Sequence, residues 1–255
     1  MASLNAIFSR AVALRVTGLA AIALGSVGLI YGDFAAVWQP VPKSLPGRTP
    51  LAYLVAALFL AGGFLLQAGR SARIGAWMLT LLYGIGAVLL HLPQIVSKPS
   101  VFVEWSGAAE QLALVAGGML TIAFSAPEGK GHRLIQSARI LFGVCLLFFG
   151  GAHLVYLKPT ADFVPAWIPP GQTFWAYATA AGHFAAGIAI LTGIAARLAA
   201  VLLTLMFIAF SVLVHGPNAF ADPSHFNWAA NAINVALVAS AWTVAASYNR
   251  PATTV

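Results

Sequence analysis

Residues 197–217 read RLAAVLLTLMFIAFSVLVHGP. Positions 198–214 carry no ionisable side chain, and a helix needs about 20 apolar residues to cross a bilayer. Residues 73–93, RIGAWMLTLLYGIGAVLLHLP, follow the same pattern. Both stretches begin with arginine and end with a histidine two residues before a proline. The pair predicts a membrane-spanning helix that occurs twice in the chain, as expected after an internal duplication.

Further matches extend the repeat beyond these helices. DFAAVWQP at residues 33–40 returns as DFVPAWIP at residues 162–169, and Glu104-Trp105 returns as Asn227-Trp228. Matched residues lie 129 positions apart at the aspartates, 124 at the histidines and 123 at the tryptophans. The copies therefore differ mainly in the length of their loops.

The composition indicates a protein whose surface faces lipid. Sixty per cent of the residues are hydrophobic and 7% are charged, whereas soluble domains carry about 25% charged residues. The net charge is +7, yet no basic stripe interleaved with exposed aromatic residues is present, so we expect no nucleic-acid partner. The expected partner is the lipid bilayer.

The expected fold is all-α, a polytopic membrane protein of about eight transmembrane helices. We expect two parallel four-helix repeats, residues 1–130 and 131–255, related by an axis along the membrane normal, with any site near that axis. The eight apolar runs are approximately Ala11–Ile30, Leu51–Ala68, Ile74–Leu92, Val101–Phe124, Ala138–Leu157, Phe174–Thr192, Leu198–Val214 and Trp228–Ala246.

The basic residues predict the orientation. Nine fall on the side of the termini, namely Arg10, Arg15, Arg70, Arg73, Lys130, Arg133, Arg139, Arg197 and Arg250. Four fall on the opposite side, namely Lys43, Arg48, Lys98 and Lys158. Because loops rich in Lys and Arg stay in the cytoplasm, both termini are expected there, in a bacterial inner membrane.

His91 and His215 are the first candidates for catalytic residues. Each precedes a proline by two residues, and we expect the proline to stop the helix and leave its last carbonyls unpaired. The partial negative charge there favours an imidazolium, which suits a pair of proton donors or ligands at the mouth of a central cavity. The alternative is a helix cap without a chemical role.

Polar residues also recur on the helices that follow. Asn227, Asn231 and Asn234 are spaced four and three apart and are expected on one face, as candidate cofactor-binding residues. Glu104, a candidate catalytic residue, occupies the matching edge of the fourth helix with Gln111. Amides in a bilayer need partners, so this stripe faces either a polar cavity or a neighbouring helix.

Two ionisable residues, Glu110 and His183, lie deeper in the predicted membrane. Glu110 is a candidate catalytic residue and His183 a candidate cofactor-binding residue, because an ionisable group within a span is a candidate for function. His153, which is expected on the outer side, is a further candidate cofactor-binding residue. The alternative is a neutral side chain hydrogen-bonded to the next helix. Haem would need two histidines from facing helices, and no spacing singles out a pair. No metal site is expected, since no HxxxH or HExxH helix occurs.

The loop at residues 162–171 is stiff and aromatic, with Trp167 at its centre. It is interpreted either as a lid over the cavity, which makes Trp167 a candidate binding residue, or as an anchor at the depth of the lipid headgroups.

Together these motifs resemble the DoxX-like membrane proteins, a group that includes the DoxD subunit associated with thiosulfate:quinone oxidoreduction. The resemblance covers roughly residues 137–247. It rests on the motifs FVPAWIPP (163–170), Phe174-Trp175, Gly182-His183, AAG (185–187), LTG (191–193), RLAA (197–200), HGP (215–217) and Asn227-Trp228. It implies a membrane-embedded helical bundle, and for some members a link to quinone-dependent sulfur oxidation or redox stress complexes. Cys145 is the one cysteine, so dithiol chemistry is not expected here.

Two functions are consistent with these observations. The first is an oxidoreductase component that handles a quinone, or another lipophilic molecule, in a cleft in the outer leaflet, with quinone or haem as the cofactor. The second is a non-enzymatic membrane carrier or a scaffold for a partner protein.

Overall fold

The computed structural model describes residues 2–127 and 131–249. Within these ranges the chain is helical without strands, and eight helices are long and apolar enough to cross a membrane. The all-α membrane fold is therefore confirmed. Lys130 and Arg250, which the orientation argument used, lie outside the described residues.

Six of the eight spans are single helices. They are α2 (Arg10–Tyr31), α3 (Arg48–Gln67), α6 (Phe102–Phe124), α7 (His132–Val155), α9 (Gln172–Thr192) and α12 (His225–Ser247). The other two, Ala72–Ser97 and Ala196–Ala221, are each built from three consecutive helical segments. Three shorter helices complete the described fold, namely α1 (Ala2–Ile7), η1 (Ala36–Trp38) and α8 (Leu157–Phe163).

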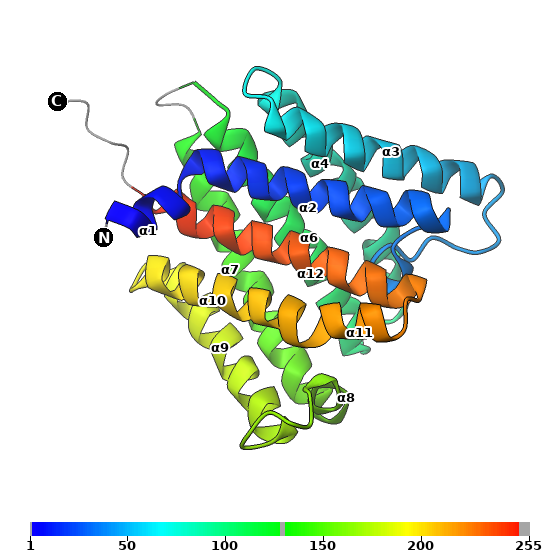
Figure 1. Cartoon of the computed structure of the whole chain (residues 1–255), viewed down its shortest axis with the longest axis vertical. Coiled ribbons are helices and arrows are strands. Elements are labelled where there is room, and N and C mark those ends of the chain that lie inside the picture. The colour runs from blue at the N-terminus through cyan, green and yellow to red at the C-terminus, as the bar shows by residue number, and fades with distance from the viewer. Residues whose placement is uncertain (1, 128–130, 250–255) are drawn as a thin grey trace.

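The spans surround α12, which packs on α2, α6 and α10 (Figure 1). In its most apolar stretch 83% of the residues are buried, against 22% in the span Ala72–Ser97. Its many alanines let neighbouring helices approach closely. The first and last described residues, Ala2 and Asn249, lie at one end of the bundle, called here the terminus end (Figure 1). The opposite end, which carries η1 and α8, is called the loop end.

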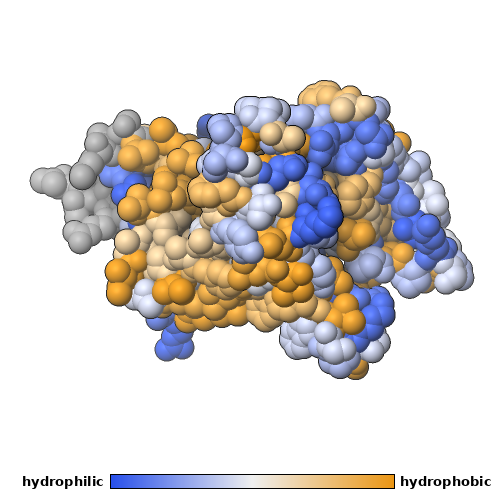
Figure 2. Space-filling view, turned by 90° about the horizontal axis from the view of Figure 1, so that it is seen from below, coloured by the Kyte–Doolittle hydropathy of each residue, from blue (hydrophilic) through white to orange (hydrophobic). Residues whose placement is uncertain are grey.

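The outer surface matches a membrane environment. Figure 2 shows hydrophobic residues over much of the face seen from below, with hydrophilic residues gathered mainly toward the end opposite the termini. Large apolar side chains such as Ile74, Leu89 and Leu198 are more than half exposed, which is costly in water and favourable against lipid tails. The protein is integral to a membrane.

The two composite spans correct the expectation that a proline ends each helix. The first comprises α4 (Ala72–Gly86), η2 (Ala87–His91) and α5 (Leu92–Ser97), and the second α10 (Ala196–Phe210), η3 (Ser211–His215) and α11 (Gly216–Ala221). Both η2 and η3 are π-helical turns. A π turn shifts the hydrogen-bond register by one residue, and this local adjustment accommodates the proline in the next turn.

An amide from the next span supports each π turn. Gln111 Nε2 donates to the carbonyl of Tyr83 at 3.2 Å, four residues before η2 begins. Asn234 Nδ2 donates to the carbonyl of Phe207 at 2.8 Å, four residues before η3 begins. Gln111 and Asn234 thus have partners on the neighbouring helix, which is the structural alternative for this stripe.

Helices α7 and α9 pack backbone to backbone where they cross. A Cβ atom added at Gly187 would lie 2.9 Å from the carbonyl oxygen of Gly143, too close for any side chain. This contact fixes the separation of the two helices, and His153 and His183 come together further toward the loop end.

Candidate functional site

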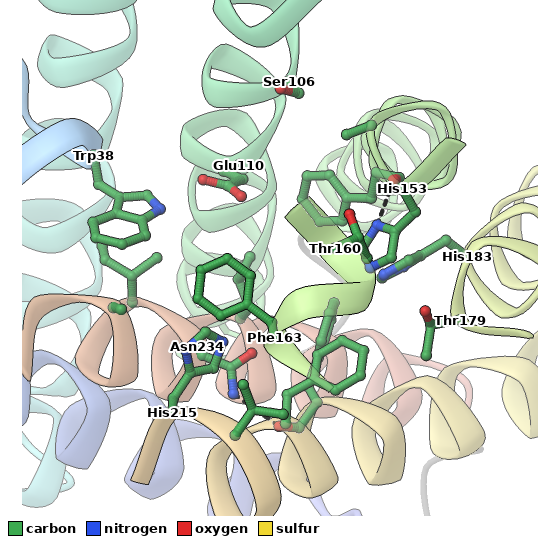
Figure 3. Close-up of a pocket in the computed structure, with 18 of the residues that line it drawn as sticks. Trp38, Ser106, Glu110, His153, Thr160, Phe163, Thr179, His183, His215 and Asn234 are labelled. Carbon is green, nitrogen blue, oxygen red and sulfur yellow. Dashed lines mark hydrogen bonds between the residues drawn. The ribbon is translucent and has the colours of Figure 1, made fainter. Parts of the chain in front are cut away.

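A cavity of about 280 Å³ lies in the half of the bundle near the loop end (Figure 3). Its walls come from α6, α7, α9, α10 with η3, and α12, while η1 and α8 contribute at the loop end. Its polar lining residues are Trp38, Ser106, Glu110, His153, Thr160, Thr179, His183, His215 and Asn234. The remaining walls are apolar, a composition typical of sites for small lipophilic molecules.

Two histidines form one side of the cavity. His153 Nδ1 lies 2.9 Å from the carbonyl oxygen of Phe149 on its own helix. His183 is 1% exposed, and its Nδ1 has no hydrogen-bond partner. The centroids of the two imidazole rings are 4.9 Å apart, and Figure 3 shows the rings side by side next to Thr160. The sequence predicted His183 deep in the membrane and His153 on the outer side, and the structure pairs them.

Aromatic rings enclose His183 on its other sides. Phe149 and Phe207 lie with their centroids 5.6 Å from the imidazole, and Phe210 lies at 6.4 Å. A polar ring in such a box has no water to compensate its nitrogens, so an unpaired nitrogen there is energetically costly.

Glu110 faces the side of η1. Figure 3 shows the indole nitrogen of Trp38 directed toward the Glu110 carboxylate. His91 lies behind this pair, 4% exposed, with its Nε2 3.1 Å from the carbonyl oxygen of Trp38. His91 does not line the cavity. Its hydrogen bond to the Trp38 carbonyl instead holds Trp38, which does line the cavity, in place.

His215 and Asn234 lie near each other on a third side of the cavity (Figure 3). Asn234 Nδ2 donates to the carbonyl of Phe207 and to Ser211 Oγ, both at 2.8 Å. Because its amide hydrogens are used in this way, Asn234 presents its carbonyl oxygen as its remaining hydrogen-bonding group. His215 terminates the π turn η3, which brings its ring to the cavity wall.

Four predicted site residues lie elsewhere. Glu104 pairs with Lys98 at 3.4 Å, and Trp167 is 73% exposed. Asn227 donates to the carbonyl and the carboxylate of Asp222, at 2.9 and 3.0 Å. Asn231 lines a separate groove of about 430 Å³ between α2 and α12. The expectation that the three asparagines share one cavity is wrong, because each amide has a different environment.

Sequence reasoning missed several lining residues. Ser106, Thr160 and Thr179 are common in membrane helices and carry no signal of their own. Trp38 belongs to the motif at 33–40, whose repeat at 162–169 indicates a duplication and not a binding role. Its position before a proline-rich loop did not reveal that η1 folds back over the bundle.

The residues present do not fit haem or a bound metal ion. The rings of His153 and His183 pack against each other, so they cannot stand on opposite faces of a porphyrin. Within residues 2–127 and 131–249, no group of three or more His, Cys, Asp or Glu side chains is close enough to hold a metal. Cys145 is buried and free, as a packing residue would be.

The family model described as DoxX matches residues 134–216. Over this segment the chain is similar to that family. The matched segment supplies twelve of the nineteen residues that line the cavity, including His153, His183 and His215. The cavity is thus built mainly from the matched segment and completed by α6, α12 and η1. No curated protein and no solved structure matches the chain.

Proposed function

We propose that the protein binds a lipophilic ring compound, such as a quinone, in this cavity and acts as a membrane component of an oxidoreductase. The observation that carries the proposal is one apolar cavity in which a carboxyl group, three imidazoles and an indole N–H meet. Lipophilic substrates reach such a site from the bilayer, and polar groups inside it orient them.

The polar groups of the cavity suit a ligand whose ring substituents gain and lose protons, as those of a quinone do. Glu110, His153, His183 and His215 are all groups that can accept or donate a proton, and all line the cavity. An electron donor outside this chain is implied, because the single cysteine rules out a dithiol–disulfide cycle within it. A protein partner at the loop end would supply those electrons.

Between the cavity and the terminus end the bundle is filled with side chains, which supports this proposal. Leu237 is the lining residue of α12 nearest the terminus end. Beyond it Ala241, Val244 and Ala245 are fully buried, and Phe142 and Leu146 of α7 are as well. These buried side chains fill the interior between α7 and α12 on that side of the cavity, which favours a binding site over a carrier.

We also propose that residues 1–130 and 131–255 are two copies of one unit, with both termini in the cytoplasm of a bacterium. The matched π turns support the duplication, as does the contact of Gly18 with Gly63, which parallels that of Gly143 with Gly187.

Filling the cavity tests the binding function. Ala230 lines the cavity, and Ala23 lines the separate groove between α2 and α12, so Ala230→Phe and Ala23→Phe form a matched pair. We expect decylubiquinone to quench the tryptophan fluorescence of the purified protein saturably, and Ala230→Phe to weaken that binding at least tenfold. Ala23→Phe should bind like the parent. Equal binding by all three proteins, or no saturable binding by the parent, would contradict the proposal.

A further inference from the structure

The hydrogen-bonding capacity of the His153–His183 pair restricts which ligand can occupy the cavity. A carbonyl oxygen only accepts, so the His153 nitrogen that lies 2.9 Å from the Phe149 carbonyl must carry the hydrogen. In the neutral ring the other nitrogen, Nε2, is then a bare acceptor. The tautomer of His153 follows from geometry alone.

His183 adds one donor and one acceptor. A neutral imidazole has one N–H group and one bare nitrogen, and His183 Nδ1 is buried without a partner. No hydrogen bond joins the two imidazoles among the contacts of the described residues. The pair therefore offers two bare nitrogens and one N–H group.

Nearby protein groups do not fill this demand. The Thr179 hydroxyl, one turn before His183, donates to the Trp175 carbonyl at 2.8 Å. Phe149, Phe207 and Phe210 have no polar side-chain atoms to offer. Thr160 lies next to the rings, but among the described residues no hydrogen bond joins it to either imidazole. Partners for the free nitrogens must therefore come from a molecule in the cavity.

We propose that the His153–His183 pair recognises a hydroxyl group on an aromatic ring, so that the cavity prefers phenol-type ligands over their ethers. A hydroxyl group accepts from the N–H of His183 and donates to a bare nitrogen in the same position. A carbonyl or ether oxygen accepts one hydrogen bond and leaves both bare nitrogens unpaired in an apolar box, which costs free energy.

The surrounding rings suit this ligand. An aromatic ring that brings its hydroxyl to His183 packs against Phe149, Phe207 and Phe210, and edge or offset contacts between such rings are favourable. This inference rests on the proposed function and specifies it: of the two forms of a quinone, the pair is complementary to the hydroxyl-bearing, reduced form.

The test compares two ligands that differ in one hydrogen-bond donor. Purified full-length protein in detergent is titrated calorimetrically with 4-pentylphenol and with its methyl ether, 4-pentylanisole, against detergent alone. The parent should bind the phenol at least tenfold more tightly than the ether. His183→Phe should reduce this ratio to about one, and His183→Gln, which keeps a donor and an acceptor, should retain part of it.

His225→Phe is the matched control. His225 also has a buried nitrogen without a partner, but it stacks on Tyr31 outside the cavity, so its replacement should leave the ratio unchanged. If the parent binds both compounds equally, the hydroxyl preference is wrong while the cavity remains a ligand site. If the parent binds neither compound, nor decylubiquinone, the proposed function falls together with this inference.

Discussion

The paired histidines have no counterpart in the first half of the chain. In the register suggested by Gly18 and Gly143, and by Gly63 and Gly187, the position of His153 corresponds to Gly28 and that of His183 to Phe59. Phe59 is 2% exposed and packs on Tyr83 with ring centroids 5.3 Å apart. An apolar ring thus fills in one half the place that a polar ring occupies in the other. If the halves are copies, only one kept or acquired a binding site.

At the same scale, we expect His91 to act as a positioning residue for Trp38. His91→Leu removes the partner of the Trp38 carbonyl and should cost about 1–3 kcal/mol of stability, because a buried carbonyl is left unpaired. His91→Gln keeps a donor and should lose less. Thermal unfolding in detergent measures both effects.

The same variants separate positioning from direct contact. Since Trp38 lines the cavity, His91→Leu should also weaken binding of decylubiquinone at a temperature where the protein is folded, and His91→Gln should restore most of the affinity. Unchanged affinity in a destabilised His91→Leu protein would show that His91 has a structural role alone.

Residue types alone predicted part of this cavity. Glu110 and His183 could be singled out because ionisable groups are expensive inside a membrane. The pairing of His153 with His183 could not, since it depends on how α7 and α9 cross at Gly143 and Gly187, two residues that are distant from each other in the chain. The interpretation that the three asparagines face one polar cavity was wrong for a related reason. Helical spacing defines a face, but α12 is enclosed by α2, α6 and α10, so neighbouring positions on that face meet different partners.

At the scale of elements, the π turns should depend on the amides that support them. Asn234→Leu removes two hydrogen bonds to the span that contains η3 and should destabilise the protein by about 1 kcal/mol, the usual size for buried polar pairs in membranes. Asn227→Leu is the comparison on the same helix, because its amide is exposed and water can replace its bonds to Asp222. Equal loss of stability in both variants would argue against a special role for the π turn.

Helix packing gives a second prediction at this scale. Gly187→Ala forces a Cβ atom to within 2.9 Å of the Gly143 carbonyl, so α7 and α9 must move apart at a cost of about 1–3 kcal/mol. Gly84→Ala is the matched control, because a Cβ there meets nothing within 4 Å and helix propensity favours alanine. Thermal unfolding of the two variants should shift in opposite directions. The phenol preference should weaken in Gly187→Ala alone, since the two imidazoles separate.

The elements themselves were predictable except at the prolines. Runs of apolar residues located all eight spans, because the bilayer imposes a minimum length on any crossing helix. The composite spans are longer than the runs suggested, since a proline was expected to end a helix. In a bundle, a wider turn accommodates the proline and an amide from the neighbouring helix supports that turn, and neither is visible in a local pattern.

For the whole molecule, the orientation remains a prediction that labelling can check. In a Cys145→Ala background, Ser100→Cys at the loop end should react with an impermeant maleimide on intact cells. Ala68→Cys, exposed near the terminus end, should react only after the membrane is permeabilised. The reverse pattern would place the termini outside and the cavity near the cytoplasm.

The enclosure of α12 also bears on how the protein is made. This helix leaves the ribosome after the other seven spans, and it is the most buried of them and among the least hydropathic, with a mean of 1.4. The earlier spans must therefore already lie in the bilayer, packed loosely enough to admit it between α2, α6 and α10. The ligand cavity, which needs Asn234 and Leu237, closes only once this helix has entered.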